Sequence, residues 1–197
     1  MLCVTVRGIQ RACGAVTGGL SDIGVFDPYD LNFTQAAAID GVNQVYTAVA
    51  ERDGVTTPSI HIIQFLVDNG EFTFKQSVTG CSVKYELEWI LQIPDIAQDL
   101  VTFLEGLDAS GCCCGLGLIY RFNSGRIFVA GERYVNDASI TKFIIKHDGS
   151  DGTSGKLLDD FNGGNIHLKG SYSRLPYEFT GTWETIEALS DIAGSGS

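Results

Sequence analysis

The clearest pattern in the chain is a strict alternation of apolar and polar residues between positions 81 and 91. The odd positions carry Cys81, Val83, Tyr85, Leu87 and Trp89, and the even positions carry Ser82, Lys84, Glu86 and Glu88. Successive side chains of a β-strand point to opposite faces, so this spacing is typical of a half-buried strand. We expect the odd face to be buried or to form an interface, and the even face to meet solvent or a channel.

A β-hairpin is predicted just before this strand. Residues 60–67 form a dense apolar run that stops at Asp68-Asn69-Gly70. Asn-Gly is a strong hairpin dipeptide because both residues tolerate a positive φ. Residues 71–78 alternate in part, as a returning strand does, so we expect the two segments to pair.

One amphipathic helix is predicted after Pro94, with Asp95 as its N-cap and its end at Leu107. Its apolar residues recur at steps of three and four, and they are Ile96, Leu100, Phe103, Leu104 and Leu107. Such a stripe covers a sheet or another subunit. Further strands are predicted at residues 112–122, 126–131, 140–146, 165–171 and 177–182.

The composition favours a turn-rich β protein. The chain of 197 residues has 24 glycines, four prolines and one methionine, and glycine supplies the positive φ that tight turns need. We expect a mainly β (α+β) fold, a β-sandwich or barrel with one flanking helix. Residues 1–58 are expected to form an extended N-terminal arm with short strands, residues 59–190 the sandwich or barrel domain, and residues 191–197 a flexible tail.

The charge and the apolar segments exclude several classes of protein. The 13 basic and 24 acidic residues give 13 − 24 = −11, which argues against a broad phosphate-binding surface. No run of about 18 apolar residues is present, so no membrane partner is expected. Arg7 and Arg11 interrupt the apolar start before a signal sequence forms, which predicts a protein made and kept in the cytoplasm.

The six cysteines, including the run at residues 112–114, lack zinc-site spacing and are expected to be reduced.

The sequence offers no recognisable catalytic arrangement. His61 and His167 lie in predicted strands and are interpreted as structural residues of the sheet. The glycine-containing segments lack the spacing of a nucleotide-binding loop. We therefore expect no enzyme activity, no cofactor and no metal.

The polar stretch at residues 147–164 is the best candidate for contacting a partner, because it is longer than a minimal turn. Its order of acidic residues departs from that of a calcium-binding EF-hand loop. The candidate interface residues in this stretch are His147, Asp148, Asp151, Asp159 and Asp160.

The order of elements carries a resemblance to a known group of proteins. An alternating strand at residues 84–91 leads into the helix at 95–107 and an apolar strand at 116–122. The turn Asn123-Ser124-Gly125-Arg126 and a strand follow, and a strand at 165–170 closes the series. In this order the segment from Val83 to Gly181 resembles the tail-tube-like virion proteins of tailed phages.

The resemblance implies a non-enzymatic virion subunit, made in the host cytoplasm, that assembles with itself into rings or a tube. It also implies contacts with other virion proteins, and DNA only as passing cargo. The net charge is compatible, because an acidic conduit repels phosphate and lets DNA slide. The alternative is a β-sandwich module that binds a ligand or carbohydrate through the loop at residues 148–164.

Overall fold

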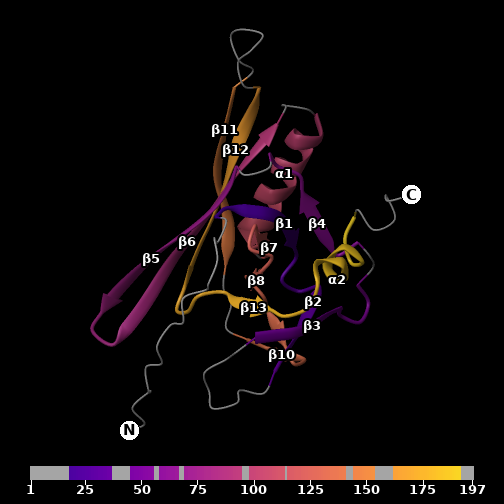
Figure 1. Ribbon diagram of the computed structural model, residues 1–197, viewed down its shortest axis with the longest axis vertical. Coiled ribbons are helices and arrows are strands. Elements are labelled where there is room, and N and C mark those ends of the chain that lie inside the picture. Colours follow the sequence, from indigo (N-terminus) through magenta and orange to yellow (C-terminus); the bar gives the residue numbers. More distant parts are fainter. Residues whose placement is uncertain are drawn as a thin grey trace.

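The computed structural model is mainly β, as the sequence predicts (Figure 1). It describes residues 18–36, 45–55, 58–66, 69–94, 98–113, 115–140, 144–153 and 162–191, with the backbone alone at 98–100 and 109–113. The strands are β1 (Leu20–Phe26), β2 (Leu31–Gln35), β3 (Val45–Glu51), β4 (Ile60–Ile63), β5 (Gly70–Thr79), β6 (Ser82–Pro94), β7 (Gly117–Phe122), β8 (Ile127–Ala130), β9 (Tyr134–Val135), β10 (Ala138–Ser139), β11 (Ile145–Thr153), β12 (Gly163–Tyr172) and β13 (Tyr177–Phe179). The helices in this part of the chain are α1 (Gln98–Cys113) and α2 (Trp183–Glu187).

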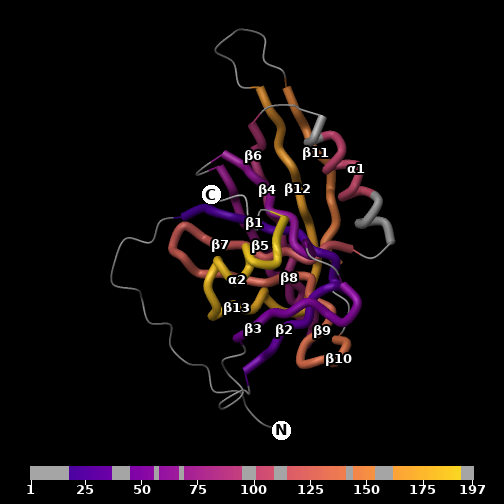
Figure 2. Tube along the Cα trace, turned by 90° about the vertical axis from the view of Figure 1, so that its right-hand side faces the viewer, coloured from indigo at the N-terminus to yellow at the C-terminus, as the bar shows by residue number. Residues whose placement is uncertain are grey.

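All the described strands belong to one mixed sheet (Figure 2). Its order is β10-β9-β2-β3-β13-β8-β7-β1-β5-β6-β12-β11, and β4 pairs with β1 beside this path. The pairs β2–β9 and β3–β13 are parallel, and the other pairs are antiparallel. β1 lies at the middle of this order and joins the two halves.

The two faces of the central strands pack into two different hydrophobic cores. On β7, Leu118 and Tyr120 pack with Trp89 of β6 in the first core, which α1 also joins. Ile119 points the other way into the second core, which includes Trp183 of α2. A strand buried on both faces needs a continuous apolar run rather than an alternation, and the sequence of β7 meets this need. The arrangement is sandwich-like, with the central strands shared between the two cores.

Gly117 shows how closely β1 and β7 approach each other. A Cβ atom at this position would lie 2.2 Å from the ring of Phe26, well inside any van der Waals contact. Phe26 is itself buried in the second core and cannot move aside without opening it. Only glycine fits at the start of β7.

The N-terminal part differs from the expected arm. Residues 20–51 do contain short strands, but β1, β2 and β3 lie inside the sheet, and β1 pairs with β4, β5 and β7. Leu20, Ile23 and Phe33 are fully buried. The described residues therefore show no boundary at residue 58, because burial of these side chains stabilises the fold more than an exposed arm could. Residues 1–17 and 37–44 lie outside the described residues.

The prediction of a hairpin with its turn at residues 68–70 is wrong. β4 pairs with β1, whereas β5 pairs with β6 along its whole length from Gly70↔Leu91 to Thr79↔Ser82. The tight turn is Gly80-Cys81, where Gly80 has φ of 63°. A two-residue turn with glycine first and a positive φ matches the twist of the two strands it joins. The partner of β5 is thus the strongly alternating strand that follows it.

The expected helix exists, and α1 continues past the expected end at Leu107 to Cys113. Cys112 and Cys113 thus lie in its last turn instead of in a strand. Leu107 is buried and Phe103 and Leu104 pack against the first core, which confirms this part of the stripe. Asp95 and Ile96 lie outside the described residues, as does the side chain of Leu100. The sequence analysis missed α2, a short helix held by two buried side chains, Trp183 and Ile186.

The described parts of the polar stretch at residues 147–164 are strand ends, and residues 154–161 lie outside the described residues. β11 continues to Thr153 and β12 starts at Gly163, with a register shift between His147 and Ser150. Gly149 has φ of 108° at this irregularity. Asp148 and Gly149, two of the residues that suggested a loop, are accommodated by an irregularity of the β-bulge kind in an exposed ribbon. Asp191, expected at the start of a flexible tail, accepts hydrogen bonds from the backbone N–H of Ile62 and pairs with His61.

Candidate functional site

The candidate site lies on the four-stranded ribbon β5-β6-β12-β11, which projects from the body of the molecule (Figure 1). β6 is its longest strand and pairs with β5 on one side and β12 on the other. Trp89 lies opposite Phe72 and Leu168, and this inner face joins the first core. Glu88 lies opposite Thr73 and Lys169 on the outer face. The alternation in β6 therefore separates an apolar face from a polar one, as predicted.

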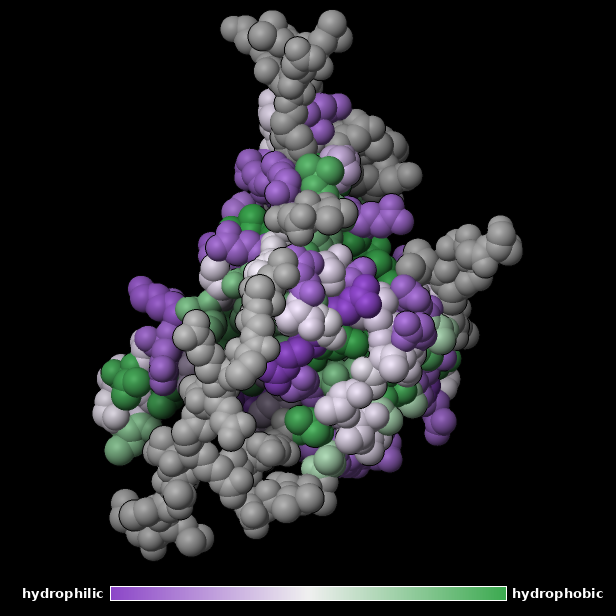
Figure 3. Space-filling model, in the orientation of Figure 1, coloured by the Kyte–Doolittle hydropathy of each residue, from purple (hydrophilic) through white to green (hydrophobic). Residues whose placement is uncertain are grey.

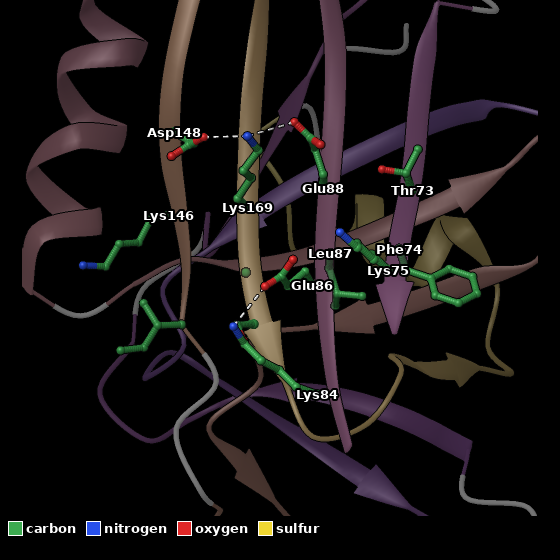
Figure 4. Close-up of a pocket in the computed structure, with 13 residues that line it drawn as sticks. Thr73, Phe74, Lys75, Lys84, Glu86, Leu87, Glu88, Lys146, Asp148 and Lys169 are labelled. Carbon is green, nitrogen blue, oxygen red and sulfur yellow. Dashed lines mark hydrogen bonds and ion pairs between the residues drawn. The ribbon is translucent and has the colours of Figure 1, made fainter. Parts of the chain in front are cut away.

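The outer face holds an open groove of about 580 Å³ (Figure 4). Its walls come from all four strands of the ribbon, together with Ile144 just before β11. Four of the six lysines in this acidic chain line the groove: Lys75, Lys84, Lys146 and Lys169. Three carboxylates, Glu86, Glu88 and Asp148, lie among them. The groove is thus a surface of mixed charge on a molecule whose net charge is −11.

Lys169 is the centre of a charge ladder across three strands. Its Nζ lies 2.7 Å from a carboxylate oxygen of Asp148 on β11 and 3.2 Å from one of Glu88 on β6 (Figure 4). The hydrogen bond to Lys169 lowers the pKa of Asp148, and the bonds to Asp148 and Glu88 raise the pKa of Lys169. Asp148 and Lys169 therefore stay charged at neutral pH, and the ladder ties β11, β12 and β6 together on their solvent side.

A second ion pair lies nearer the end of the ribbon. Lys84 Nζ lies 3.0 Å from Glu86 Oε1 on the same strand, and this hydrogen bond lowers the pKa of Glu86. Lys75 lies opposite Glu86 in the register of β5 and β6. Neither Lys75 nor Lys146 forms an ion pair with a residue that the structure describes. Two of the four lysines in the groove are therefore neutralised locally, and the ammonium groups of Lys75 and Lys146 remain for contacts with another molecule.

The edge of β5 opposite β6 is open along most of its length. β5 pairs with β1 only through Gly70, so residues 71–79 have no second strand beside them within the described part of the chain. A long unpaired edge presents a row of backbone N–H and C=O groups that can pair with another chain. This segment contains no proline and no bulge against β6. Of the usual protections of an edge strand, only charged side chains are present here, those of Glu71 and Lys75.

The inner face of the same hairpin extends beyond the core and exposes apolar side chains. Phe74 is 54% exposed and Val78 is 62% exposed. Tyr85 of β6 contacts the ring of Phe74, with 6.5 Å between the ring centroids. In Figure 3 hydrophobic surface lies at the free end of β5–β6, at the lower left. A two-stranded ribbon of this kind is marginally stable in water by itself, so its end is suited to contact another protein.

The other edge of the ribbon is the outer side of β11. β11 pairs with β12, and a bridge joins Ile145 to Leu116 at its start. Beyond Ile145 no other strand pairs with β11 among the described residues, although α1 packs against β11 and Asp108 of α1 bonds to His147. The ribbon thus has an unpaired strand edge on each side, one on β5 and one on the part of β11 beyond His147.

The structure separates the candidate interface residues from one another. Asp148 lies in the groove, and Asp151 is exposed near the end of β11, where its carboxylate accepts a hydrogen bond from Asn165 at 3.1 Å. The side chain of His147 is only 7% exposed, and its Nδ1 lies 2.6 Å from Asp108 of α1. His147 therefore fixes the helix to β11 instead of facing a partner. Asp159 and Asp160 lie outside the described residues.

The other two histidines have structural partners as well. His61 Nδ1 lies 3.1 Å from Asp191, and His167 Nδ1 lies 3.4 Å from Glu88. Neither lies beside a nucleophile in the groove, whose described lining contains no histidine or cysteine. The described residues also contain no cluster of three or more histidine, cysteine or carboxylate side chains suited to a metal.

Sequence reasoning missed most of the groove. The alternation identified Lys84, Glu86 and Glu88 as an outer face. Lys169 and Lys146 come from strands about 60 to 85 positions further along the chain, and only the register of β6, β12 and β11 brings them to the same face. An alternation in residues 163–172 that places Lys169 opposite the apolar positions was the available signal.

Comparison of the chain with protein-family models, with curated proteins and with solved structures finds no match. Within the described residues, neither helix has the length and apolar character that crossing a membrane requires.

Proposed function

We propose that the protein is a structural subunit that assembles with itself, and that the open edge of β5 is the contact that drives assembly. The observation that carries this proposal is the nine-residue edge at positions 71–79, which has no partner strand among the described residues on the side away from β6 and bears the exposed side chains of Phe74 and Val78. Pairing with another strand satisfies the backbone groups of such an edge and removes the apolar surface from water.

The partner strand in this proposal is β11 of a second copy. β5 and β11 are the two outer strands of the same ribbon, so their pairing joins two different surfaces of identical chains. A contact between different surfaces repeats from copy to copy and generates either a closed ring or an open filament. The ribbon then continues from subunit to subunit as one sheet.

The polar outer face is the one suited to line the channel of such a ring. The opposite face carries the first core and, towards the end of the hairpin, the exposed apolar side chains of Phe74 and Val78. Along the groove, Lys84 and Lys169 pair with Glu86, Glu88 and Asp148, which leaves Lys75 and Lys146 as the unpaired cations of the described lining and limits the attraction for a passing polyanion. This supports a conduit through which DNA slides without adhering.

The assignment to a phage virion is part of the same proposal and rests on the resemblance to tail-tube-like proteins. In this assignment the subunit is not an enzyme, its partners are its own copies and other virion proteins, and DNA is cargo. The alternative, a β-sandwich module that binds a ligand, requires a protein that remains a monomer.

The test uses two single substitutions at neighbouring positions of β5. Val78→Lys places a charge on the exposed apolar face of the hairpin, and Ser77→Lys places the same charge on the polar face. Both side chains are exposed, so neither change removes a core contact. We expect wild type and Ser77→Lys to form rings or tubes in negative-stain images, and Val78→Lys to remain a monomer by light scattering.

Far-ultraviolet circular dichroism of the two variants provides the control for folding. Equal assembly of Val78→Lys and wild type would exclude the hairpin end as the contact. A wild-type protein that stays monomeric at high concentration would overturn the proposal and favour the ligand-binding alternative.

A further inference from the structure

A second cavity lies on another side of the molecule, between α1 and the strands β1 and β4. Its volume is about 320 Å³, at the lower end of the range for small-molecule sites. Phe103 and Leu107 of α1 form one wall, and Val25 and Leu116 contribute to the other. This cleft shares no lining residue with the lysine groove on the ribbon.

The polar groups of the cleft are acidic. Asp27 and Asp30, at the turn that joins β1 to β2, line it together with His61. No lysine or arginine lines the cleft within the described residues. The apolar walls and the two carboxylates together match a ligand with an apolar body and a positively charged end.

Asp30 is the group that points to a ligand. Its carboxylate is half-buried and forms no hydrogen bond or ion pair with the described residues. Burial is the main cause that raises its pKa, and the charge of Asp27 raises the pKa further, while the charge of Arg52 outside the cleft lowers it in part. A partly desolvated carboxylate without a partner costs the fold stability, and this cost is relieved when a cation binds beside it.

Gly106 lines the same cleft from the middle of α1. Glycine is unfavourable at a helix interior, and no close packing requires it here, because a Cβ atom would meet no other atom within 4 Å. The open space beside Gly106 leaves the cleft accessible.

We propose that this cleft binds a primary ammonium group on a short apolar stem, with Asp30 as the counter-ion and Phe103 and Leu107 against the stem. The same chemistry is offered by a free alkylamine and by a lysine side chain of another copy. The cleft is separate from the ribbon, so this proposal does not depend on the proposed function.

The test is a titration of the full chain with hexylammonium, hexanol and hexanoate at fixed ionic strength, followed by amide chemical shifts of residues 27–30 and 103–107. We expect hexylammonium to bind saturably and more tightly than the other two. Asp30→Asn should weaken its binding by about fivefold or more, because the charged partner is lost. Gly106→Leu should abolish binding by filling the space beside the helix.

Glu105→Gln is the matched control, because it removes one negative charge from α1 at a position that does not line the cleft. Equal binding of hexanol and hexylammonium, or unchanged affinity in Asp30→Asn, would overturn the proposal even if Gly106→Leu fails to fold. Sedimentation in the presence of hexylammonium separates the two sources. Dissociation of an oligomer indicates that the amine replaces a lysine of another copy, whereas unchanged mass indicates a site for a small amine.

Discussion

At the scale of single residues, the most constrained group is a buried charge in the second half of the molecule. Glu132 is only 1% exposed, accepts a hydrogen bond from the hydroxyl of Tyr46 at 2.6 Å, and pairs with Arg174. The guanidinium of Arg174 stacks on the rings of Tyr177 and Tyr172, at 3.7 and 4.6 Å from their centroids. Burial and the nearby charge of Glu132 both raise the pKa of Tyr46, so its hydroxyl remains a donor. This cluster fixes the turn between β12 and β13.

Arg174→Met is expected to lower the free energy of unfolding by about 3 kcal/mol, because it leaves the buried carboxylate of Glu132 without its ion-pair partner. Arg126→Met is the control, since Arg126 pairs with Glu178 but its side chain is 61% exposed. Exposed pairs contribute at most about 1 kcal/mol. Urea denaturation measures the free energy of unfolding of both variants. An equal decrease in the two variants would show that groups other than Arg174 stabilise Glu132.

Some of these residue-level features were predictable and others were not. The burial of Leu87 and Trp89 follows from alternation within one strand, because successive side chains of a strand point to opposite faces. The cluster of Tyr46, Glu132 and Arg174 joins positions 86 and 42 residues apart, and no local pattern marks it. The groove lysines are likewise brought together by register between distant strands.

At the scale of elements, α1 is held to the sheet mainly by the end of its apolar stripe. Leu107 is buried in the first core, whereas Val101 is 39% exposed. Asp108 adds a bond to His147 beneath the helix. The helix therefore has one strongly anchored turn.

Leu107→Ala should destabilise the protein by about 2–4 kcal/mol, through lost burial and the cavity that remains. Val101→Ala should change the stability by less than about 0.5 kcal/mol, because an exposed side chain contributes little. Thermal or urea unfolding of both variants measures these two changes in stability. A small effect of Leu107→Ala would mean that α1 does not pack on the core in solution.

Two elements show where local signals fail. The Asn-Gly dipeptide at residues 69–70 has the chemistry of a hairpin turn. The strand before it, β4, nevertheless pairs with β1 and not with β5, because this pairing buries β4. Residues 112–113 have no polar neighbours that mark one face of a strand, and the helix that contains Leu107 continues through them. For the Asn-Gly segment, tertiary contacts decide between conformations that the local sequence allows.

At the scale of the whole molecule, the net charge of −11 opposes association of identical copies. Salt screens this repulsion over a length of about 10 Å at 0.1 M. We expect the average mass at constant protein concentration to rise as the salt concentration increases from about 0.02 to 0.3 M, because strand pairing and apolar contacts do not need long-range attraction. Sedimentation velocity measures this dependence. A mass that falls with salt would indicate that ion pairs of the groove hold the copies together.

The mainly β class and the separation of an apolar from a polar face in β6 follow from composition and alternation. The division into arm and domain could not be predicted, because the strands of residues 20–51 are stabilised by neighbours about 100 positions away. The proposed function is harder still to predict from the sequence, because it depends on which strand edges remain unpaired after folding.

The most direct test of the account is backbone hydrogen exchange along β5, compared between dilute and concentrated protein. The account predicts that residues 71–79 exchange rapidly at their open edge in the monomer and gain protection on assembly, together with residues 146–153 of β11. Gly117–Phe122 in the centre of the sheet should be protected in both samples. Assembly without added protection in β5 would contradict the account, because the copies would then associate through another surface.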